Sequence, residues 1–403
     1  MLGSGSTLFA RASLALALAW VPLARAVYAP VPDQGVGQEW TVSLRSGATW
    51  DNNIFGAAHD KIASWVFEAV PEIAFAGSLD DRTYAEFNYT LTLDHFDNRP
   101  GTRDFASHLV SGRLAREFTP TVSLDVTDLF AIVKNPESLL AGADGVTHTK
   151  NTNQSFDRNE ADARATVNLA PKIGLVAKFR EVHFAYDNVN LARAIDRDEL
   201  LYGLEGTYDI LPELKAVGEA RHEDIYYRIG GETKNKRTDF VMAGLDYALA
   251  KKFSLTSRLG GEWRDRASES STNSPYVELS ARYDYAKGSF LSGGYVYTFE
   301  ETSNVAQYND TLVNRFFVNI QHAITPLVVA SGSVTFEPST LEGRRGISSS
   351  KNEHSTHAGV ALTWLPTPHW SFAITADHDL VSSEDVSRHQ ERDRYGMNVG
   401  YTF

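Results

Sequence analysis

Few residues of this 403-residue chain have a type and spacing that would support catalysis. The chain contains no Cys, which excludes a thiol nucleophile, and it has neither a Gly-x-Ser-x-Gly nor a His-Glu-x-x-His motif. His354 and His357 form the one close His pair, with Glu353 beside them. On an extended chain, however, the two imidazoles would point to opposite faces. The sequence therefore predicts no enzyme, no metal site and no cofactor.

Asp51, Asn52 and Asn53 are consecutive residues with side-chain oxygen atoms, which are the ligands that Ca²⁺ prefers. Asp and Asn are also common turn formers. The sequence alone leaves two interpretations open for these residues, a calcium ligand set and a turn.

The elements that carry these residues are strands. After Trp40, most of the chain consists of segments of about 9–14 residues in which apolar and polar residues alternate. Successive side chains of a strand point to opposite faces, so each segment predicts a strand with one apolar and one more polar face. The eighteen segments begin near residues 40, 63, 83, 105, 121, 161, 173, 198, 214, 238, 253, 275, 289, 311, 327, 355, 369 and 393.

Two kinds of connection alternate between these segments, long polar loops and tight turns, and the tight turns contain six of the prolines. This layout predicts an all-β fold, a transmembrane antiparallel up-and-down β-barrel of about eighteen strands, with both termini periplasmic. The alternative is a soluble β-sandwich, but its strands are usually only about 5–6 residues long.

The N-terminus has the features of a secretory signal peptide. Arg11 precedes an apolar run from Leu14 to Leu23, and Ala24-Arg25-Ala26 supplies a small-x-small cleavage pattern. The run is shorter than the roughly 20 residues of a spanning helix. We therefore expect a signal peptide (1–26) cleaved near Ala26, a short periplasmic N-terminal segment (27–38) and an outer-membrane β-barrel (39–403).

Aromatic residues mark the expected lipid interfaces. Trp40 and Trp50 bracket the first strand, Trp65 begins the second, and Trp364 and Trp370 flank a tight turn. Amphipathic rings at both strand ends are typical of the two aromatic girdles of a membrane barrel.

One short motif resembles a known family. Trp50-Asp51-Asn52-Asn53-Ile54-Phe55 is similar to the Y/W-D-x-N-I/V-F element of outer-membrane β-barrel porin-like proteins. Asp94-His95-Phe96-Asp97-Asn98 and the terminal Tyr401-Thr402-Phe403 are also similar to that group. The resemblance implies a Gram-negative outer-membrane protein that is often linked to exopolysaccharide systems. It also implies that Tyr401 and Phe403 are an assembly signal for the barrel-assembly machinery.

If the apolar faces meet lipid, the polar faces line the interior. The charged residues predicted to line the pore are Arg45, Glu68, Glu86, Arg113, Asp125, Arg164, Lys178, Arg180, Arg221, Arg258, Glu262, Glu278, Arg282 and Arg315. Because both signs are mixed, they predict a polar channel without indicating anion or cation selectivity. The alternative is a salt-bridge network that only stiffens the wall.

These features predict a channel for the passive diffusion or export of small solutes or polysaccharide. The alternative is a closed barrel that acts as a structural anchor or surface-recognition protein. Outer-membrane lipids and the barrel-assembly machinery are the expected partners, whereas a net charge of −13 argues against nucleic acid.

Three places depart from the regular pattern. Asp128 falls on the apolar face of its strand, which predicts a β-bulge near Thr127 that turns it inward. In segment 173–186 the apolar residues change face partway, from Leu175, Ala177 and Phe179 to Val182 and Phe184, which predicts a second irregularity. The longest loop, 135–160, is either a solvated outer loop or a constriction folded into the bore.

Overall fold

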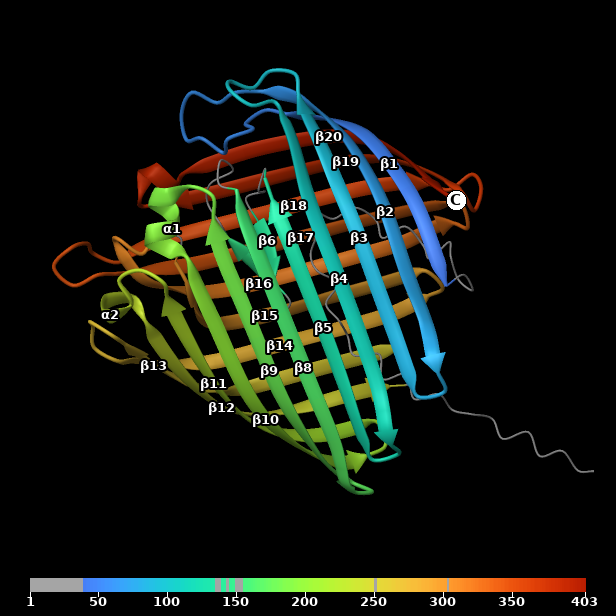
Figure 1. Ribbon diagram of the computed structural model, residues 1–403, viewed down its shortest axis with the longest axis vertical. Coiled ribbons are helices and arrows are strands. Elements are labelled where there is room, and N and C mark those ends of the chain that lie inside the picture. The colour runs from blue at the N-terminus through green and yellow to red at the C-terminus, as the bar shows by residue number, and fades with distance from the viewer. Residues whose placement is uncertain (1–38, 135–138, 143–144, 149–154, 250–251, 303) are drawn as a thin grey trace, which may run out of the picture.

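The computed structural model describes residues 39–134, 139–142, 145–148, 155–249, 252–302 and 304–403. In these residues, eighteen strands form one antiparallel sheet that closes on itself, because the first strand pairs with the last (Figure 1). The strands of the barrel are Trp40–Asp51 (β1), Ser64–Asp80 (β2), Thr83–Phe96 (β3), Asp104–Thr119 (β4), Val122–Val133 (β5), Phe156–Ala170 (β8), Ile173–Tyr186 (β9), Arg197–Leu211 (β10), Leu214–Tyr227 (β11), Lys236–Leu249 (β12), Phe253–Arg266 (β13), Thr272–Ala286 (β14), Ser289–Glu301 (β15), Tyr308–Thr325 (β16), Val328–Gly343 (β17), Lys351–Trp364 (β18), Trp370–Ser383 (β19) and Gln390–Thr402 (β20).

The remaining described elements are short and lie in the long connections. Leu139–Gly142 (β6) and Gly145–His148 (β7) pair as a small hairpin within the longest loop. The other three are Val189–Ile195 (α1), Gly231–Lys234 (α2) and the 3-10 turn Val386–Arg388 (η1). None of the described helices is long or apolar enough to cross a membrane.

The predicted fold class, an antiparallel up-and-down barrel of eighteen strands, is confirmed. The largest difference in a strand start is at β8, which begins at Phe156 instead of near 161. The barrel begins and ends at the end that carries the tight turns, because Thr402 pairs with Ser43 near the start of β1. We call this the turn end and the opposite one the loop end. That the turn end is periplasmic stays a prediction, and the signal peptide and segment 27–38 lie outside the described residues.

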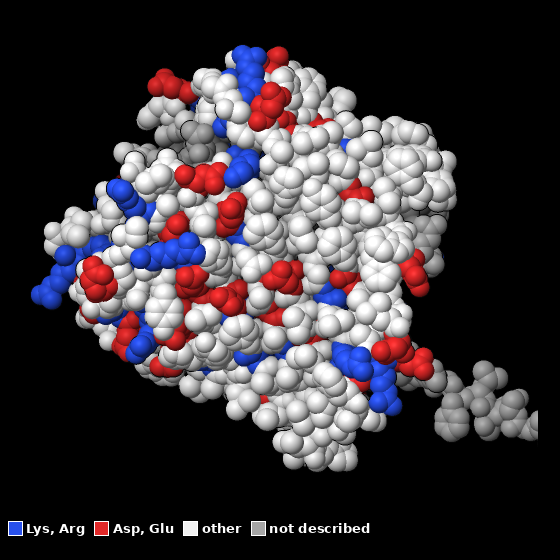
Figure 2. Space-filling view, in the orientation of Figure 1, with Lys and Arg blue, Asp and Glu red and all other residues white. Residues whose placement is uncertain are grey.

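Alternation places apolar side chains on the outer face of the barrel. On β12, Val241, Leu245 and Leu249 are exposed, whereas Phe240 and Met242 are buried inside. Figure 2 shows a white surface over the lowest part of the molecule, a mixed group of charges at the lower right, and more charged side chains toward the loops. Closure leaves the eighteen-stranded sheet without an edge strand, and this satisfies the requirement of a hydrocarbon environment. The outer surface is therefore suited to a lipid bilayer.

Tryptophans mark both ends of this apolar surface. All six that lie in the described residues are exposed. Trp40, Trp364 and Trp370 lie at the turn end, and Trp50, Trp65 and Trp263 lie toward the loop end. This distribution is the one expected of two aromatic girdles.

Both predicted strand irregularities are wrong. The pairing of β5 with β8 runs from Val122 to Val133 without a register shift, so there is no bulge near Thr127. Asp128 stays on the outer face, where it accepts a hydrogen bond from Asn159 (3.0 Å). Strand β9 also keeps its register from Gly174 to Tyr186. Its Val182 and Phe184 point into the barrel and are buried there. The strand therefore does not change face; its inner face is polar around Lys178 and becomes apolar at Val182 and Phe184.

Candidate functional site

The inner wall of the barrel carries the charged residues that the sequence singles out. All fourteen lie on the face opposite the exposed apolar positions of their strands, as Arg113 does beside the exposed Leu114. The structure brings several into ion pairs: Arg45 with Glu68 (3.4 Å), Arg113 with Asp125 (2.6 Å), Arg180 with Asp162 (2.8 Å), Arg282 with Asp284 (2.8 Å) and Arg315 with Glu337 (2.6 Å). That these residues line an open pore stays a prediction.

Two buried carboxylates organise the middle of the inner wall. Lys178 on β9 lies 2.7 Å from Glu205 and 2.8 Å from Glu219, on β10 and β11. Arg258 on β13 reaches the same two carboxylates at 3.2 and 3.3 Å. The side chains of Glu205 and Glu219 are only 2% and 0% exposed, whereas that of Lys178 is 20% exposed. Because the acids lie beneath the bases, this part of the wall presents N–H donors to the bore.

The other predicted residues of this region join the same network. Arg164 lies 3.5 Å from Glu205, and Arg221 lies 2.7 Å from Glu219. Glu278 is within 3.8 Å of Arg221. These contacts join side chains of six strands, β8 to β11, β13 and β14, in one charged layer, which fits the salt-bridge alternative as well as a polar pore lining.

One hairpin tip leaves the wall at the loop end. Pairing between β14 and β15 stops at Tyr297, while β15 continues to Glu301 paired only with β16. Tyr308, Asn309 and Asp310 are consecutive and all buried, which a wall strand with one face toward lipid would not show. We call residues 298–302 and 304–310 the strap.

The strap contacts the inner wall through ions and hydrogen bonds. Lys236 on β12 lies 2.7 Å from Glu301 and 2.8 Å from Asp310. Arg264 on β13 lies 2.8 Å from Asp310 and 3.3 Å from Glu301. Glu262, one of the predicted pore residues, accepts hydrogen bonds from the strap backbone and from a strap hydroxyl at 3.0 and 2.8 Å. Glu262 points inward from its strand, but it is 0% exposed and these hydrogen bonds are to the strap.

The strap also makes contacts at two separate parts of the mouth. On one side, Val305 is buried in an apolar cluster that includes Phe184 of β9, Ile195 of α1 and Tyr227 of β11. On the other side, the hydroxyl of Tyr308 donates to Asp385 in the β19–β20 loop (3.1 Å). The strap thus spans the opening at the loop end of the barrel, which we call the mouth, from β9 and β11 on one side to the β19–β20 loop on the other.

Asp385 is well placed to stay ionised in this contact. Burial raises its pKa, but hydrogen bonds from the side chain and backbone of Ser387 outweigh burial, and Tyr308 and the Arg388 cation act in the same direction. The pKa of Asp385 is therefore below its usual value, and the carboxylate can accept from Tyr308 at neutral pH.

The Trp50–Phe55 motif fastens the seam between the first and last strands. Asp51 accepts a hydrogen bond from Nε of Arg392 (2.9 Å). Asn52 and Asp393 exchange two hydrogen bonds at 2.7 and 2.8 Å. Asn53 donates to the carbonyl of Glu391 (2.8 Å). Oδ1 of Asp51 also accepts from the backbone N–H of Asn53, and Oδ1 of Asn53 accepts from the backbone N–H of Ala57. Every side-chain oxygen of Asp51, Asn52 and Asn53 thus accepts a hydrogen bond from the chain itself, so the turn interpretation is favoured over a calcium ligand set.

The His pair is split between the two faces of β18, as predicted. His357 is buried inside and contacts Asp379 (2.5 Å), whereas His354 is exposed and stacks on Phe336. In the part of the chain that the structure describes, no group of three or more His, Asp or Glu side chains could hold a metal ion.

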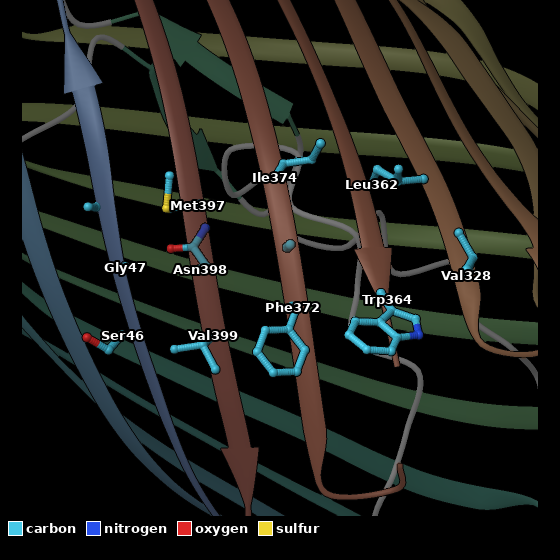
Figure 3. A pocket seen from close by; sticks show the side chains of 12 residues that line it. Ser46, Gly47, Val328, Leu362, Trp364, Phe372, Ile374, Met397, Asn398 and Val399 are labelled. Atoms are coloured by element: carbon cyan, nitrogen blue, oxygen red, sulfur yellow. The ribbon is translucent and has the colours of Figure 1, made fainter. Parts of the chain in front are cut away.

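An apolar pocket of about 620 Å³ lies on the outer wall (Figure 3). Its lining includes Leu362, Trp364, Phe372, Ile374 and Met397, whose side chains are all exposed. These residues belong to the face with the apolar surface, so the pocket is not part of the bore.

The strap is the feature that sequence reasoning missed. Lys236, Glu301 and Asp310 were not among the predicted pore residues, and their local sequence shows only strand ends beside a loop. Lys236 and Glu301 are 65 positions apart, so no spacing rule could connect them.

The longest loop was the predicted candidate for a constriction. Of the predicted loop 135–160, the described residues are the β6–β7 hairpin and 155–160, and the last five of these already belong to β8. Its placement against the bore therefore stays a hypothesis.

A closed barrel with an apolar outer face and a charged inner face defines the class as a porin-type membrane barrel, which fits the family indicated by the Trp50–Phe55 motif. Comparison with models of known protein families finds no match, and comparison with curated proteins finds none either. Solved structures that align with most of the chain include the outer membrane protein OpdK of Pseudomonas aeruginosa, with 11% identity, 90% of this chain and 98% of that chain covered, and a TM-score of 0.46. Pseudomonas aeruginosa OccK2 has 10% identity, with 91% of this chain and 98% of that chain covered and a TM-score of 0.48. Acinetobacter baumannii OccAB3 has 11% identity, with 91% of this chain and 99% of that chain covered and a TM-score of 0.45.

Proposed function

We propose that this protein is an outer-membrane channel for the passive diffusion of small polar solutes. The observation that supports this most directly is the charged inner wall. An eighteen-stranded barrel is wide enough to leave an aqueous path, and its inner face carries accessible ions of both signs, such as Arg45 and Glu68. No catalytic role is assigned to these residues, whose contacts are structural ion pairs.

The narrower proposal is export of a polysaccharide, which rests only on the motif resemblance. Uptake of radiolabelled solutes into vesicles separates the solute classes, because small sugars and short oligosaccharides would enter at different rates through a channel of fixed width.

We also propose how the protein reaches its membrane. The signal peptide is cleaved near Ala26, the barrel-assembly machinery recognises Tyr401 and Phe403, and lipid surrounds the apolar outer face.

Reconstitution of the mature chain into planar bilayers tests the channel itself. We expect stepwise, stable current increases as single barrels insert. As a control, the chain denatured before addition should give no steps. Silence over many insertions of correctly folded barrel would sink the proposal.

The second candidate function is a closed barrel that anchors or displays its loops. The observation that favours it is the strap, which bridges the mouth, together with the cross-linked charges of the inner wall. A folded barrel that inserts into vesicles but releases no entrapped small solute would support this candidate over the channel.

A further inference from the structure

We propose that the strap is a displaceable barrier across the loop-end mouth, held shut by an ionic latch. The latch consists of Lys236, Arg264 and Arg266 on the wall and Glu301 and Asp310 on the strap. The barrier role rests on the proposed channel function, whereas the latch itself does not.

Strand spacing shows that the strap lies away from the wall. Lys236 is on β12 and Glu301 is on β15, three strands further around the sheet. Adjacent strands are about 4.8 Å apart, so the two backbones would be separated by roughly 14 Å or more along the wall. Lys236 and Glu301 nevertheless meet at 2.7 Å. Lys236 also donates to the backbone carbonyl of Asn309 (2.5 Å) on β16, four strands from β12 and too far along the wall for one lysine side chain to reach. The tip must therefore fold over the inner face of β12 and β13.

The sheet holds the strap at one edge only. Beyond Tyr297, no backbone pair joins β15 to β14 in the described residues. On its other side, the strap remains attached to β17, since Tyr308 pairs with Gly343 and Thr311 with Leu341 across a register shift. Release from the latch would therefore break side-chain contacts while the hairpin stays tethered at the β17 edge.

The latch is asymmetric in its chemistry. Three cations meet two strap carboxylates, and Asp310 contacts all three cations at 2.5–2.8 Å. The side chains of Lys236, Arg264 and Asp310 are at most 3% exposed. Salt would screen such buried pairs only weakly, so substitution is the way to open the latch.

The test replaces both strap carboxylates, Glu301→Gln with Asp310→Asn, because these changes keep side-chain shape and remove the charge. The matched control is Asp209→Asn, which removes a lumen carboxylate 3.8 Å from Lys215 at the turn end. Each is combined with Val305→Cys, since the natural chain has no Cys and Val305 is 4% exposed in the closed strap.

The first measurement is the rate at which a water-soluble maleimide labels the cysteine in refolded barrels. We expect slow labelling in the otherwise natural chain and in the control, and labelling about tenfold faster in the latch variant, because labelling follows the open population. Equal rates would overturn the latch, whether or not the barrel conducts. Unchanged circular dichroism spectra establish that all three chains are folded.

The second measurement is single-channel conductance, without label, of the same three chains. We expect about a twofold increase for the latch variant and no change for the control. Faster labelling with unchanged conductance would overturn the barrier role. Silence of all three chains would overturn the proposed channel and the barrier together, while the labelling rates still decide the latch.

Discussion

At the residue scale, two contacts between an acidic and a basic side chain differ sharply in their surroundings. The pair of Asp51 and Arg392 is buried, with side chains 1% and 6% exposed. The pair of His95 and Asp104 lies at the outer surface, with side chains 52% and 82% exposed. Water screens an exposed pair, whereas a buried charge that loses its partner keeps its full desolvation cost. The same chemical contact should therefore contribute very differently to stability.

We expect Asp51→Ala to lower the free energy of unfolding by about 3–5 kcal/mol, because it leaves the Arg392 guanidinium buried beside an empty site. Asp104→Ala is the control and should cost less than about 1 kcal/mol. Urea unfolding of the barrel in lipid vesicles measures both. Similar losses for the two variants would contradict this assignment.

The strap contact of Asp385 has a defined pH dependence. Its pKa lies below the ordinary value, so its stabilising contribution is present in full above about pH 4 and is lost as the pH falls through the lower folded-state pKa. Proteolysis of the β19–β20 loop should therefore be equally slow at pH 7 and pH 5. Asp385→Asn should accelerate it already at pH 7. Faster cleavage of the natural chain at pH 5 than at pH 7 would contradict the lowered pKa.

At the element scale, strand β9 shows what alternation reveals and what it conceals. Its even-numbered residues face inward along the whole strand, from Lys178 in the central cluster to Phe184 in the apolar cluster of the mouth. The strand itself was predictable because its period of two persists. The faces were misassigned because the inner face is polar at mid-height and apolar at the mouth, and a single sequence does not state at which height this change occurs.

The strap could not be predicted for a different reason. Its local sequence shows only two strand ends and the loop between them, and long-range contacts such as those with Lys236, Arg264 and Glu262 draw it from the wall. Such contacts depend on the closed arrangement of strands, which is absent from local sequence. The fold and the inward-facing charges were therefore predictable, whereas the layout of the mouth was not.

Helix α1 depends on a lysine from the next loop. Nζ of Lys234 donates to the carbonyls of Arg193 (3.1 Å) and Ala194 (2.9 Å) near the end of α1, and to Ile229 (3.0 Å). A cation at this end satisfies carbonyls that the helix leaves unpaired and complements its dipole.

We expect Lys234→Met to destabilise α1 locally by about 1 kcal/mol and to speed amide hydrogen exchange in residues 189–196. Glu232→Gln, two residues before Lys234 in α2, is the control and should leave hydrogen exchange in α1 unchanged. Protection unaffected by the loss of Lys234 would show that packing against the mouth cluster alone holds α1.

At the scale of the whole molecule, paired His and Asp residues mark the limit of the apolar outer face toward the loop end. Among the described residues, four such pairs lie on the outer face, and each joins residues directly opposite one another on neighbouring strands: His95–Asp104, His183–Asp198, His222–Asp239 and His378–Asp393. Exposed apolar residues follow immediately toward the turn end, such as Val241 after Asp239 and Tyr395 after Asp393. The hydrocarbon boundary should therefore lie just below these pairs.

This boundary predicts a depth-dependent effect of a new charge. Leu245→Arg, near the middle of the apolar face of β12, should lower the stability of the barrel in a bilayer by about 2–4 kcal/mol. Asp239→Arg, on the same face above the boundary, should change it by no more than about 1 kcal/mol. Unfolding in vesicles measures both, and equal costs at the two positions would place the boundary elsewhere.

The seam between β1 and β20 has a consequence for the order of assembly. Asp51 and Arg392 are 341 positions apart, and β1 pairs with β20 only over Ser43–Asp51. Bringing such distant parts of the chain together is the slowest kind of contact to form, since little local structure favours it beforehand. The nascent protein should thus persist as an open, curved sheet with two bare edges until its last strand has been delivered. The hydrogen bonds of Asn52 and Asn53 with Glu391 and Asp393 would then form last and close the barrel. Their loss should therefore lengthen the lifetime of the open sheet more than it lowers the stability of the closed barrel.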